Sequence, residues 1–385
     1  MKIKLRQAFD LQMGKTPARN RPDYWNGDHK WISIADIGNA GKILTKTKES
    51  ITEAGIDGSG IKVVPQGTVI MSFKLSIGKT AITSEDMYTN EAIMAFIDNG
   101  KFAVDTDYLY HLCCGTNWTA GTNKAVMGLT LNKATLLEKE IPLPDINEQH
   151  EIATKLDKID AIIAERQQQL EVIDQAVKSR FIELFGDPVT NPYGWQQLTV
   201  NDVCVSVVRG PFGSALKKEF FVPPSDTTYK VYEQKHAIQK SSTIGTYYVT
   251  AEKYNELRRF ECHSGDILMS CSGTMGELYQ LPAGCERGII NQALCKFTLN
   301  ERILPIVFLA YMREIIGNLE TKGSGIQNIA AVSYVKAMPI NLPPMRVQEQ
   351  FATFVEQADK SKLAVQKGLQ ELEILKKSLM QQYFG

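Results

Sequence analysis

Apolar residues recur at alternating spacings of four and three along two long segments, one ending at Gly186 and the other at Gly385. This spacing keeps one face of an α-helix apolar, and over several heptads it predicts a coiled-coil seam. One such helix could belong to an ordinary globular core, but two of equal length favour pairing. The predicted seam positions are Ile152, Leu156, Ile159, Ile163, Leu170, Ile173 and Val177 in the first segment, and Phe351, Val355, Val365, Leu369, Leu372 and Leu379 in the second.

The two helical segments belong to an internal repeat. Residues 141–186 align without a gap with 340–385, and 13 of the 46 aligned positions are identical, where chance at average composition gives roughly three. Upstream, residues 67–72 align with 265–270, and residues 90–93 align with 291–294, in the same order. The sequence therefore predicts a duplication in which each half holds one domain followed by one long helix.

Helix length predicts how the two helices pair. A helix over 147–185 is roughly 58 Å long, whereas the ends of a compact domain usually lie close together. Parallel pairing would force the domain between the helices to bridge that length, so antiparallel pairing is expected, with the domains at opposite ends.

The regions outside the helices read as mixed α/β. Short apolar runs at 31–34, 67–73 and 266–269 are typical of strands, and 103–114 and 305–317 are typical of helices. The predicted fold is α/β (mixed α+β), with two tandem domains in a pseudo-two-fold arrangement separated by two long antiparallel coiled-coil helices. The predicted boundaries are 1–144 and 187–343 for the domains, and 145–186 and 344–385 for the helices.

Composition narrows the class of protein. Apolar residues make up 43% and charged residues 22%, which is typical of a globular chain. The 43 basic and 43 acidic residues cancel, which argues against a uniformly basic binder. Seven cysteines without a C-x-x-C favour neither a disulfide framework nor structural zinc. The first residues lack the apolar core of a secretory signal, and no apolar run is long enough for a bilayer, so we expect a soluble, cytoplasmic protein with no membrane role.

A search for catalytic motifs finds none. Gly-Lys-Thr occurs at 14–16 and 78–80, but Phe9 and Phe73 stand where a P-loop needs its first glycine. Asn191-Pro192-Tyr193 lacks the second proline of an adenine methyltransferase tetrad, and no acid pair with a nearby Glu-x-Lys indicates a nuclease. The five histidines show no ligand spacing, so no metal site is predicted.

A local binding signal remains. In the first 31 residues, seven Lys and Arg side chains oppose three aspartates, with two tryptophans and a tyrosine interleaved. Basic and aromatic side chains together suit nucleic acid. On charge alone, however, a merely solvated surface explains the pattern equally well.

Specific residues resemble a known family. The segments 14–17, 23–28 and 31–37 resemble a target recognition domain of the specificity subunits of type I restriction–modification enzymes. Ile141-Pro-Leu-Pro144, Glu148-Gln149 and the following helix resemble the first conserved region of that family, and 342–385 resembles the second. The second domain, with Arg209-Gly-Pro-Phe-Gly-Ser214 and 291–294, resembles another class of the same module. One departure is Glu91, where the second copy has Gln292.

The resemblance implies a function without catalysis by this chain. It implies a subunit that binds double-stranded DNA and two methylation subunits, forming an adenine-N6 methyltransferase, with restriction subunits added in the full ATP-dependent nuclease. S-adenosylmethionine, ATP and Mg²⁺ would then sit on partner subunits only, and this chain would carry no cofactor. A stand-alone DNA-modifying enzyme and a coiled-coil adaptor without a DNA role are the alternatives.

Two different domains on a spacer of fixed length imply a bipartite, asymmetric target whose two half-sites lie between one and two turns of B-DNA apart. Basic and amide side chains in turns of the two domains are the expected DNA contacts, because they suit phosphates, guanine and adenine. The candidates are Lys15, Arg19, Arg21, Lys30, Lys74 and Lys79 in the first domain, and Arg209, Lys217, Lys218, Lys235, Lys322 and Gln327 in the second.

Overall fold

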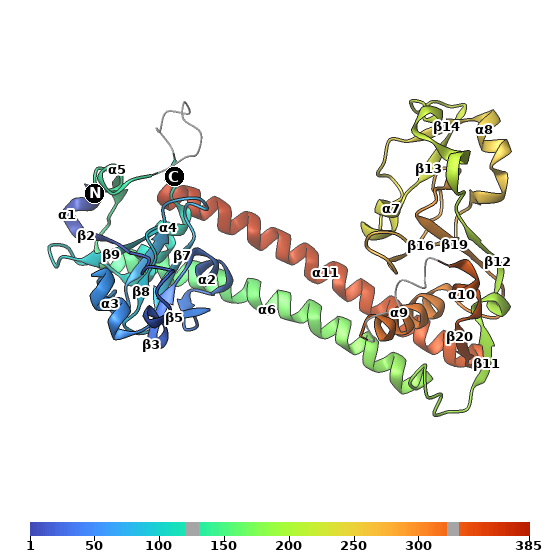
Figure 1. The fold of residues 1–385 in the computed structure, drawn as a ribbon, viewed down its shortest axis with the longest axis horizontal. Helices are drawn as coiled ribbons and strands as arrows, with labels where there is room; N and C mark the ends of the chain where they lie inside the picture. Colours follow the sequence, from blue (N-terminus) through green and yellow to red (C-terminus); the bar gives the residue numbers. More distant parts are fainter. Residues whose placement is uncertain (120–130, 322–330) are drawn as a thin grey trace. The chain divides into compact units, whose positions relative to one another are not determined.

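The computed structural model describes residues 1–119, 131–321 and 331–385 (Figure 1). The chain divides into two compact units. Unit 1 comprises Met1–Gln169 and Val365–Gly385, and unit 2 comprises Leu170–Ala364. Each unit therefore holds one α/β domain together with a part of each long helix, and the predicted mixed α/β class is confirmed.

The two long helices are α6 (Ile146–Phe185) and α11 (Met345–Phe384), of 40 residues each. At 1.5 Å per residue each helix is about 60 Å long. The first begins two residues after Pro144 and the second directly after Pro344. The first helix ends at Phe185, and the following Gly186 has a φ of +77°, a left-handed conformation that favours glycine.

The helices pack antiparallel within each unit. In unit 1, Asp160 of α6 forms an ion pair with Lys376 of α11, while the earlier Leu156 lies in one core with the later Phe384. In unit 2, Asp174 pairs with Lys362, and the later Phe185 packs on the earlier Phe351 with ring centroids 5.1 Å apart. In both cases a later residue of α6 meets an earlier residue of α11, which confirms the predicted antiparallel pairing.

The predicted seam faces inward along both helices. Five of its positions, Ile152, Leu156, Ile159, Phe351 and Val355, are buried. The remaining seam positions are half-buried, as expected where a single neighbouring helix covers them. Lys362 and Lys376 interrupt the apolar pattern of the second helix, and both lysines are the ones that pair with aspartates of α6.

Unit 1 is built on a five-stranded sheet of order β2-β9-β6-β7-β4, a three-stranded sheet β5-β3-β8, and a two-stranded sheet β1-β10. The strands are β1 (Lys2–Lys4), β2 (Phe9–Met13), β3 (Trp25–Ile32), β4 (Ile43–Leu44), β5 (Glu49–Ile51), β6 (Val69–Ser72), β7 (Thr80–Thr83), β8 (Tyr88–Thr89), β9 (Ile93–Asp98) and β10 (Glu140–Pro142). The helices are α1 (Leu5–Ala8), η1 (Pro22–Tyr24), α2 (Ile34–Asn39), α3 (Glu53–Ser59), α4 (Thr106–Gly115) and α5 (Lys133–Leu137).

Unit 2 is built on two four-stranded sheets, β12-β19-β16-β17 and β14-β13-β18-β15, and a two-stranded sheet β11-β20. The strands are β11 (Gln196–Thr199), β12 (Cys204–Arg209), β13 (Thr228–Tyr232), β14 (Tyr248–Thr250), β15 (Glu261–Cys262), β16 (Ile267–Ser270), β17 (Leu278–Gln280), β18 (Gly288–Ile290), β19 (Leu294–Leu299) and β20 (Pro339–Leu342). The helices are η2 (Val200–Val203), η3 (Gly213–Leu216), η4 (Lys218–Phe220), α7 (Gln234–Ile238), α8 (Ala251–Glu256), η5 (Arg258–Phe260), α9 (Pro305–Thr321) and α10 (Val332–Ala337).

The duplication seen in the sequence extends to the topology. The strand order β2-β9-β6-β7 of unit 1 corresponds to β12-β19-β16-β17 of unit 2. The parallel pair β3-β8 corresponds to the parallel pair β13-β18. The strands predicted around residues 31, 69 and 267 and the helices predicted at 103–114 and 305–317 are confirmed. β3 ends at Ile32 rather than continuing to residue 34, because the Ser33 side chain accepts a hydrogen bond from the Asp36 N–H and caps α2.

The largest apolar core of each unit joins the main sheet to the long helices. In unit 1, Phe9 and Phe96 of the sheet share a core with Leu156 and Phe384. In unit 2, Phe297 shares a core with residues of both long helices, including Phe181 and Phe351. No helix of the described residues is long and apolar enough to cross a membrane.

Candidate nucleic-acid interface

Three loops meet at one edge of the main sheet in unit 1. They are the strand-end loop (residues 14–17) after β2, the serine loop (73–79) between β6 and β7, and the asparagine turn (90–92) before β9. The sheet register brings them together, because Met13 lies opposite Met94 and Ser72 lies opposite Ile93. The corresponding loops of unit 2 are 210–214, 271–277 and 291–293, brought together by Arg209 opposite Cys295 and Ser270 opposite Leu294. We refer to each set as a loop cluster.

A buried serine holds the serine loop in both units. The Ser270 hydroxyl donates to the Thr274 carbonyl at 2.7 Å and accepts the Glu277 N–H at 2.9 Å. The Ser72 hydroxyl likewise donates to the Ser76 carbonyl and accepts the Lys79 N–H. Both serines are fully buried. The two loops therefore have the same backbone although they share almost no sequence.

An asparagine organises the neighbouring turn in the same way. The Asn90 side-chain oxygen accepts the Ala92 N–H at 3.0 Å, and the Asn291 oxygen accepts the Ala293 N–H at 3.0 Å. The backbone N–H groups of the two asparagines donate to the ends of β3 and β13 at 3.0 and 2.9 Å. Each turn thus joins the sheet that contains β9 or β19 to the sheet that contains β3 or β13.

Glycine is required where the strand-end loop approaches the asparagine turn. A Cβ atom on Gly14 would lie 2.1 Å from the Thr89 carbonyl oxygen, and one on Gly210 would lie 1.9 Å from the Asn291 carbonyl oxygen. Neither backbone oxygen can move without breaking its turn, so any side chain would separate the two loops.

Three of the predicted DNA contacts are held by carboxylates of unit 1. Arg19 pairs with Glu49, Arg21 with Asp23 at 2.7 Å, and Lys30 with Glu85. The guanidinium of Arg19 also lies 3.9 Å from the centre of the Trp25 ring. The hydrogen bond that the Arg19 guanidinium donates to the Glu49 carboxylate is the largest influence on Arg19 and raises its pKa. These cations are therefore partly neutralised within the domain, although Arg19 and Arg21 remain exposed.

The other three candidates of unit 1 lie in or beside its loop cluster. Lys15 is exposed and its ammonium donates to the Ser59 carbonyl at 3.1 Å. Lys74 and Lys79 both belong to the serine loop, where Lys79 is exposed and the Lys74 ammonium lies 5.2 Å from the centre of the Phe73 ring. None of the three forms an ion pair within 4.0 Å among the described residues. The absence of a direct ion pair leaves their positive charge available for phosphate contact.

Glu91 gives the asparagine turn of unit 1 a negative charge that sequence reasoning did not use. Partial burial acts to raise its pKa, but the hydrogen bond from the Thr16 hydroxyl and the charges of Lys74 and Arg19 act in the opposite direction, and the pKa lies below its ordinary value. Glu91 is therefore an acceptor with no proton to donate. The equivalent residue of unit 2, the exposed Gln292, can both donate and accept.

Arg209 is the last residue of β12 and borders the loop cluster of unit 2. Its guanidinium donates to the Gln292 carbonyl at 2.9 Å and to the Cys271 carbonyl at 3.3 Å, so it ties all three loops together. It also lies 5.6 Å from the centre of the Phe212 ring, which is 67% exposed. Arg209 therefore has a positioning role in addition to any contact with DNA.

The remaining candidates of unit 2 are more scattered. Lys217 pairs with Glu219 at 3.6 Å and Lys235 with Glu233 at 2.6 Å, while Lys218 is exposed in η4. Lys322 and Gln327 lie outside the described residues. Sequence reasoning missed Gln234, whose buried side-chain oxygen has no hydrogen-bond partner among the described residues. A Cβ atom on Gly273 of the serine loop would be 3.3 Å from the amide nitrogen of Gln234. This amide therefore borders the loop cluster.

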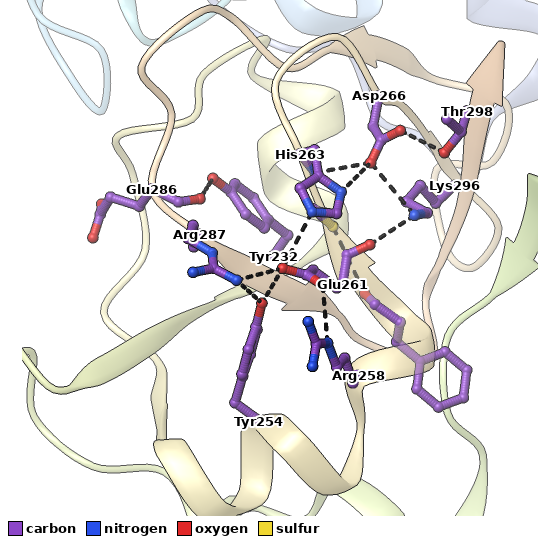
Figure 2. Close-up of polar contacts among 12 residues, drawn as sticks. Tyr232, Tyr254, Arg258, Glu261, His263, Asp266, Glu286, Arg287, Lys296 and Thr298 are labelled. Carbon is purple, nitrogen blue, oxygen red and sulfur yellow. Dashed lines mark hydrogen bonds and ion pairs between the residues drawn. The ribbon is translucent and has the colours of Figure 1, made fainter. Parts of the chain in front are cut away.

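The structure also brings together an ionic cluster in unit 2 that the sequence did not predict (Figure 2). The Glu261 carboxylate accepts from Tyr254 and from Arg287, the latter at 2.9 Å. The Lys296 ammonium donates to the Glu261 carbonyl at 2.7 Å and lies 3.4 Å from Asp266.

These contacts leave each carboxylate of the cluster with cationic or hydroxyl partners from the same domain. Asp266 also accepts from the Thr298 hydroxyl at 2.6 Å. Among the described residues no group of three His, Cys, Asp or Glu side chains could hold a metal ion. The cluster therefore reads as a structural network that ties β15, β16 and β19 together.

These features define a class of protein before any comparison: a duplicated chain whose two units present the same loop framework with different side chains. A family model described as "Type I restriction modification DNA specificity domain" matches residues 1–175 and 192–374. The chain belongs to this family, and the predicted resemblance is confirmed.

Curated relatives agree with the family assignment. The type I restriction enzyme MjaIX specificity subunit of Methanocaldococcus jannaschii is 29% identical over 203 residues, covering 52% of this chain and 46% of that protein. The EcoprrI specificity subunit of Escherichia coli is 27% identical over 177 residues, covering 42% of this chain and 43% of that protein. The chain thus spans less than half the length of these two relatives.

Solved structures share the fold. A chain from a study of complex assembly and conformational transition of the type I R-M system has a TM-score of 0.69 at 17% identity, and the match covers 100% of this chain and 97% of that one. The type I restriction–modification S subunit of M. genitalium has a TM-score of 0.51 at 15% identity, covering 100% and 96%. At such identities the likeness concerns the fold.

Proposed function

We propose that this chain is the DNA-reading, non-catalytic subunit of a type I restriction–modification complex, with each unit reading one half of a bipartite, asymmetric target. The observation that carries the proposal is the pair of loop clusters: the same serine, asparagine and glycine positions hold both, while the exposed side chains differ. A constant framework with variable tips is what two readers of different base sequences need.

The chemistry of the tips supports reading of duplex DNA. Lys15, Lys74 and Lys79 supply positive charge in unit 1 that no direct ion pair among the described residues neutralises, which suits phosphates. Glu91 and Gln292 stand at equivalent positions and differ in hydrogen-bonding character. A carboxylate accepts from the cytosine amino group, whereas a glutamine amide pairs with adenine at two atoms. The two units would then read different bases from the same place.

We further propose that the partners of this chain are two methylation subunits, with restriction subunits in the full complex. Adenine methylation would then take place on the methylation subunits, which would hold S-adenosylmethionine, while ATP and Mg²⁺ would be used by the restriction subunits. The exposed apolar residues on the outer faces of the long helices, such as Val172 and Ile374, at 59% and 69% exposure, offer docking surface for such subunits.

The test begins with the full chain purified with and without its cognate methylation subunit. Labelled S-adenosylmethionine and genomic DNA report methyl transfer, and sequencing of methylated adenines reports the target. The complex should methylate a two-part target, and the chain alone should not methylate. Methylation by the chain alone at a rate comparable with the complex would overturn the proposal.

A domain exchange tests whether the units read independently. Replacing residues 187–343 with the equivalent block of another family member should change one half of the methylated target and leave the other half intact. Lengthening α6 and α11 by one heptad each should keep both halves and widen the unread gap by about three base pairs, because seven residues add about 10 Å. An exchange that altered both halves would contradict independent reading.

A further inference from the structure

Leu75, at the tip of the serine loop of unit 1, is 88% exposed and is the most exposed large apolar side chain of the described residues. Its φ of +61° lies in the left-handed region. Only Asn26, Leu75, Asn191 and Lys240 combine positive φ with a side chain in the part of the chain that the structure describes. Leu75 is the one apolar residue among them, and asparagine tolerates this conformation far better than leucine.

The residues on either side of Leu75 explain why its side chain projects. Phe73 is 1% exposed within the core of unit 1, and Ile77 packs against the same core. The loop is therefore fastened at both of these positions, and by Ser72, while the residue halfway between them points away. The exposure of Leu75 is a consequence of a well-anchored loop.

Unit 2 provides a direct comparison for this position. Its serine loop has the same anchors, with Cys271 buried and Met275 half-buried, and the equivalent tip residue is Gly273 with the same φ of +61°. Glycine meets the backbone requirement without strain. Leucine at this position therefore costs stability through left-handed strain, and because its side chain stays exposed, burial does not compensate for that cost.

We propose that Leu75 makes an apolar contact with the bases of DNA in the half-site that unit 1 reads. This inference rests on the function proposed above. Lys74 is the neighbour of Leu75 in the chain, Lys79 belongs to the same loop, and Lys15 belongs to the same loop cluster, so the cluster that carries the leucine also carries positive charge suited to phosphates. Leucine is one of the side chains used as an apolar wedge between base steps, and apolar side chains also pack on the thymine methyl group. In both kinds of contact, the apolar side chain leaves water and packs against the bases.

The proposal predicts that stability and DNA binding respond in opposite directions. In the complex with the methylation subunit, Leu75→Gly should raise the melting temperature of unit 1 because it removes the strain. The same variant should bind about tenfold more weakly to a duplex that contains the target sequence identified by methylation mapping. Leu75→Met, which keeps an apolar side chain of similar volume, should restore most of the affinity. Val205→Ala, at a side chain 73% exposed on β12 and away from the loop cluster, should leave binding unchanged.

Salt dependence separates this contact from the phosphate contacts. Leu75→Gly should lower the affinity equally at all salt concentrations, whereas Lys79→Ala should reduce the slope of log affinity against log salt by about one. If Lys79→Ala weakens binding and Leu75→Gly does not, the Leu75 inference is overturned while the proposed function stands. If the complex does not bind the duplex specifically, the proposed function itself fails. A Leu75→Gly variant that melts lower and is not rescued by Leu75→Met would also overturn the inference, because the loop would then need the leucine to fold.

Two modified duplexes distinguish the sources of the apolar contact. Deoxyuridine in place of each thymine of the half-site removes the methyl group, and should weaken the wild-type complex but not the Leu75→Gly complex if the leucine packs on a methyl. 2-Aminopurine in the half-site should brighten with the wild-type complex alone if the leucine separates base steps. Wild-type behaviour identical to Leu75→Gly on both duplexes would contradict the inference.

Discussion

The loop clusters of the two units share a framework but differ in chemistry. Both are held by a buried serine, an asparagine turn and a glycine that touches the neighbouring backbone. Yet the serine loop of unit 1 presents two lysines and a leucine, whereas that of unit 2 presents small residues and lacks a lysine. The comparison teaches that the residues which hold the loops are interior and satisfied by backbone groups, so the exposed positions are free to differ.

The largest effect should come from the helix seam, which both units share at equivalent positions. Leu156→Asp in unit 1 and Val355→Asp in unit 2 each place a charge at a site that is 0% and 8% exposed. An unpaired buried charge should lower the free energy of unfolding by about 4 kcal/mol in either unit. Urea unfolding measures the effect, and Val172→Asp at an exposed position of α6 is the control. A small effect at one of the two sites would show that the units do not use the seam equally.

Glycine at the strand-end loop should matter nearly as much. Gly14→Ala and Gly210→Ala each force a Cβ atom against a carbonyl oxygen, and we expect each to cost about 3 kcal/mol. Each should also abolish reading of one half-site only. Thermal unfolding and maps of methylated adenines measure both effects. Gly41→Ala, where nothing lies within 4 Å of the added atom, is the matched control. If Gly14→Ala were tolerated while Gly210→Ala was not, the two loop clusters would not be structurally equivalent at this position.

Exchanging the acid and the amide of the asparagine turns should sharpen the comparison. Glu91→Gln should change the base preferred in the first half-site, and Gln292→Glu that in the second, with roughly 1–3 kcal/mol of discrimination at the affected base. Stability should change little, since both side chains are exposed. Methylation of a duplex library randomised at the target gives the preference. An unchanged preference in both variants would remove these residues from base reading.

Each unit contains one buried histidine that should make stability depend on pH. Burial is the largest influence on both His111 and His236, and it lowers their pKa below the ordinary value of 6.5. The unfolded chain therefore binds a proton more readily than the folded chain, so stability is full above about pH 6.5 and falls as the pH is lowered. The carboxylate of Asp157 contacts both His111 and Lys42, and its pKa is lowered below the ordinary value. The stability that ionised Asp157 contributes is therefore lost only at still lower pH.

Each histidine should contribute at most about 1.4 kcal/mol per pH unit to this slope. Urea unfolding between pH 5 and 7.5 should show a smaller slope in His111→Gln and in His236→Gln than in the wild type. His150→Gln should behave like the wild type, because that side chain is 75% exposed. An unchanged slope in one of the two buried variants would locate the pH dependence in the other unit.

The smallest expected effect concerns the two ion pairs between α6 and α11. A double-mutant cycle on Asp160 and Lys376 in unit 1 should give up to about 1 kcal/mol, and the cycle on Asp174 and Lys362 in unit 2 should give less. The reason is exposure: the carboxylate side chain is 33% exposed in the first pair and 59% in the second. Equal coupling energies would argue that exposure does not set their strength.

The sequence predicted the helices, their antiparallel pairing and much of the sheet framework. Seam positions such as Leu156 and Phe351 follow from periodicity, which is a local property that survives in the fold. The strands at 67–73 and 266–269 follow from short apolar runs, and the internal repeat pairs the segments 90–93 and 291–294. The DNA contacts were harder to predict, because the sequence does not reveal which basic side chains pair with carboxylates in the folded domain.

The amino-acid sequence by itself determined the duplication, the mixed α/β class and the two paired helices, because each depends on spacing or repetition along the chain. Only the tertiary structure decided which side chains are free to act. Arg19 and Lys30 find their carboxylates 30 and 55 residues away. Leu75 is exposed because Ser72, Phe73 and Ile77 fasten the loop around it. Such contacts depend on how distant segments pack, and no local pattern in the chain encodes that packing.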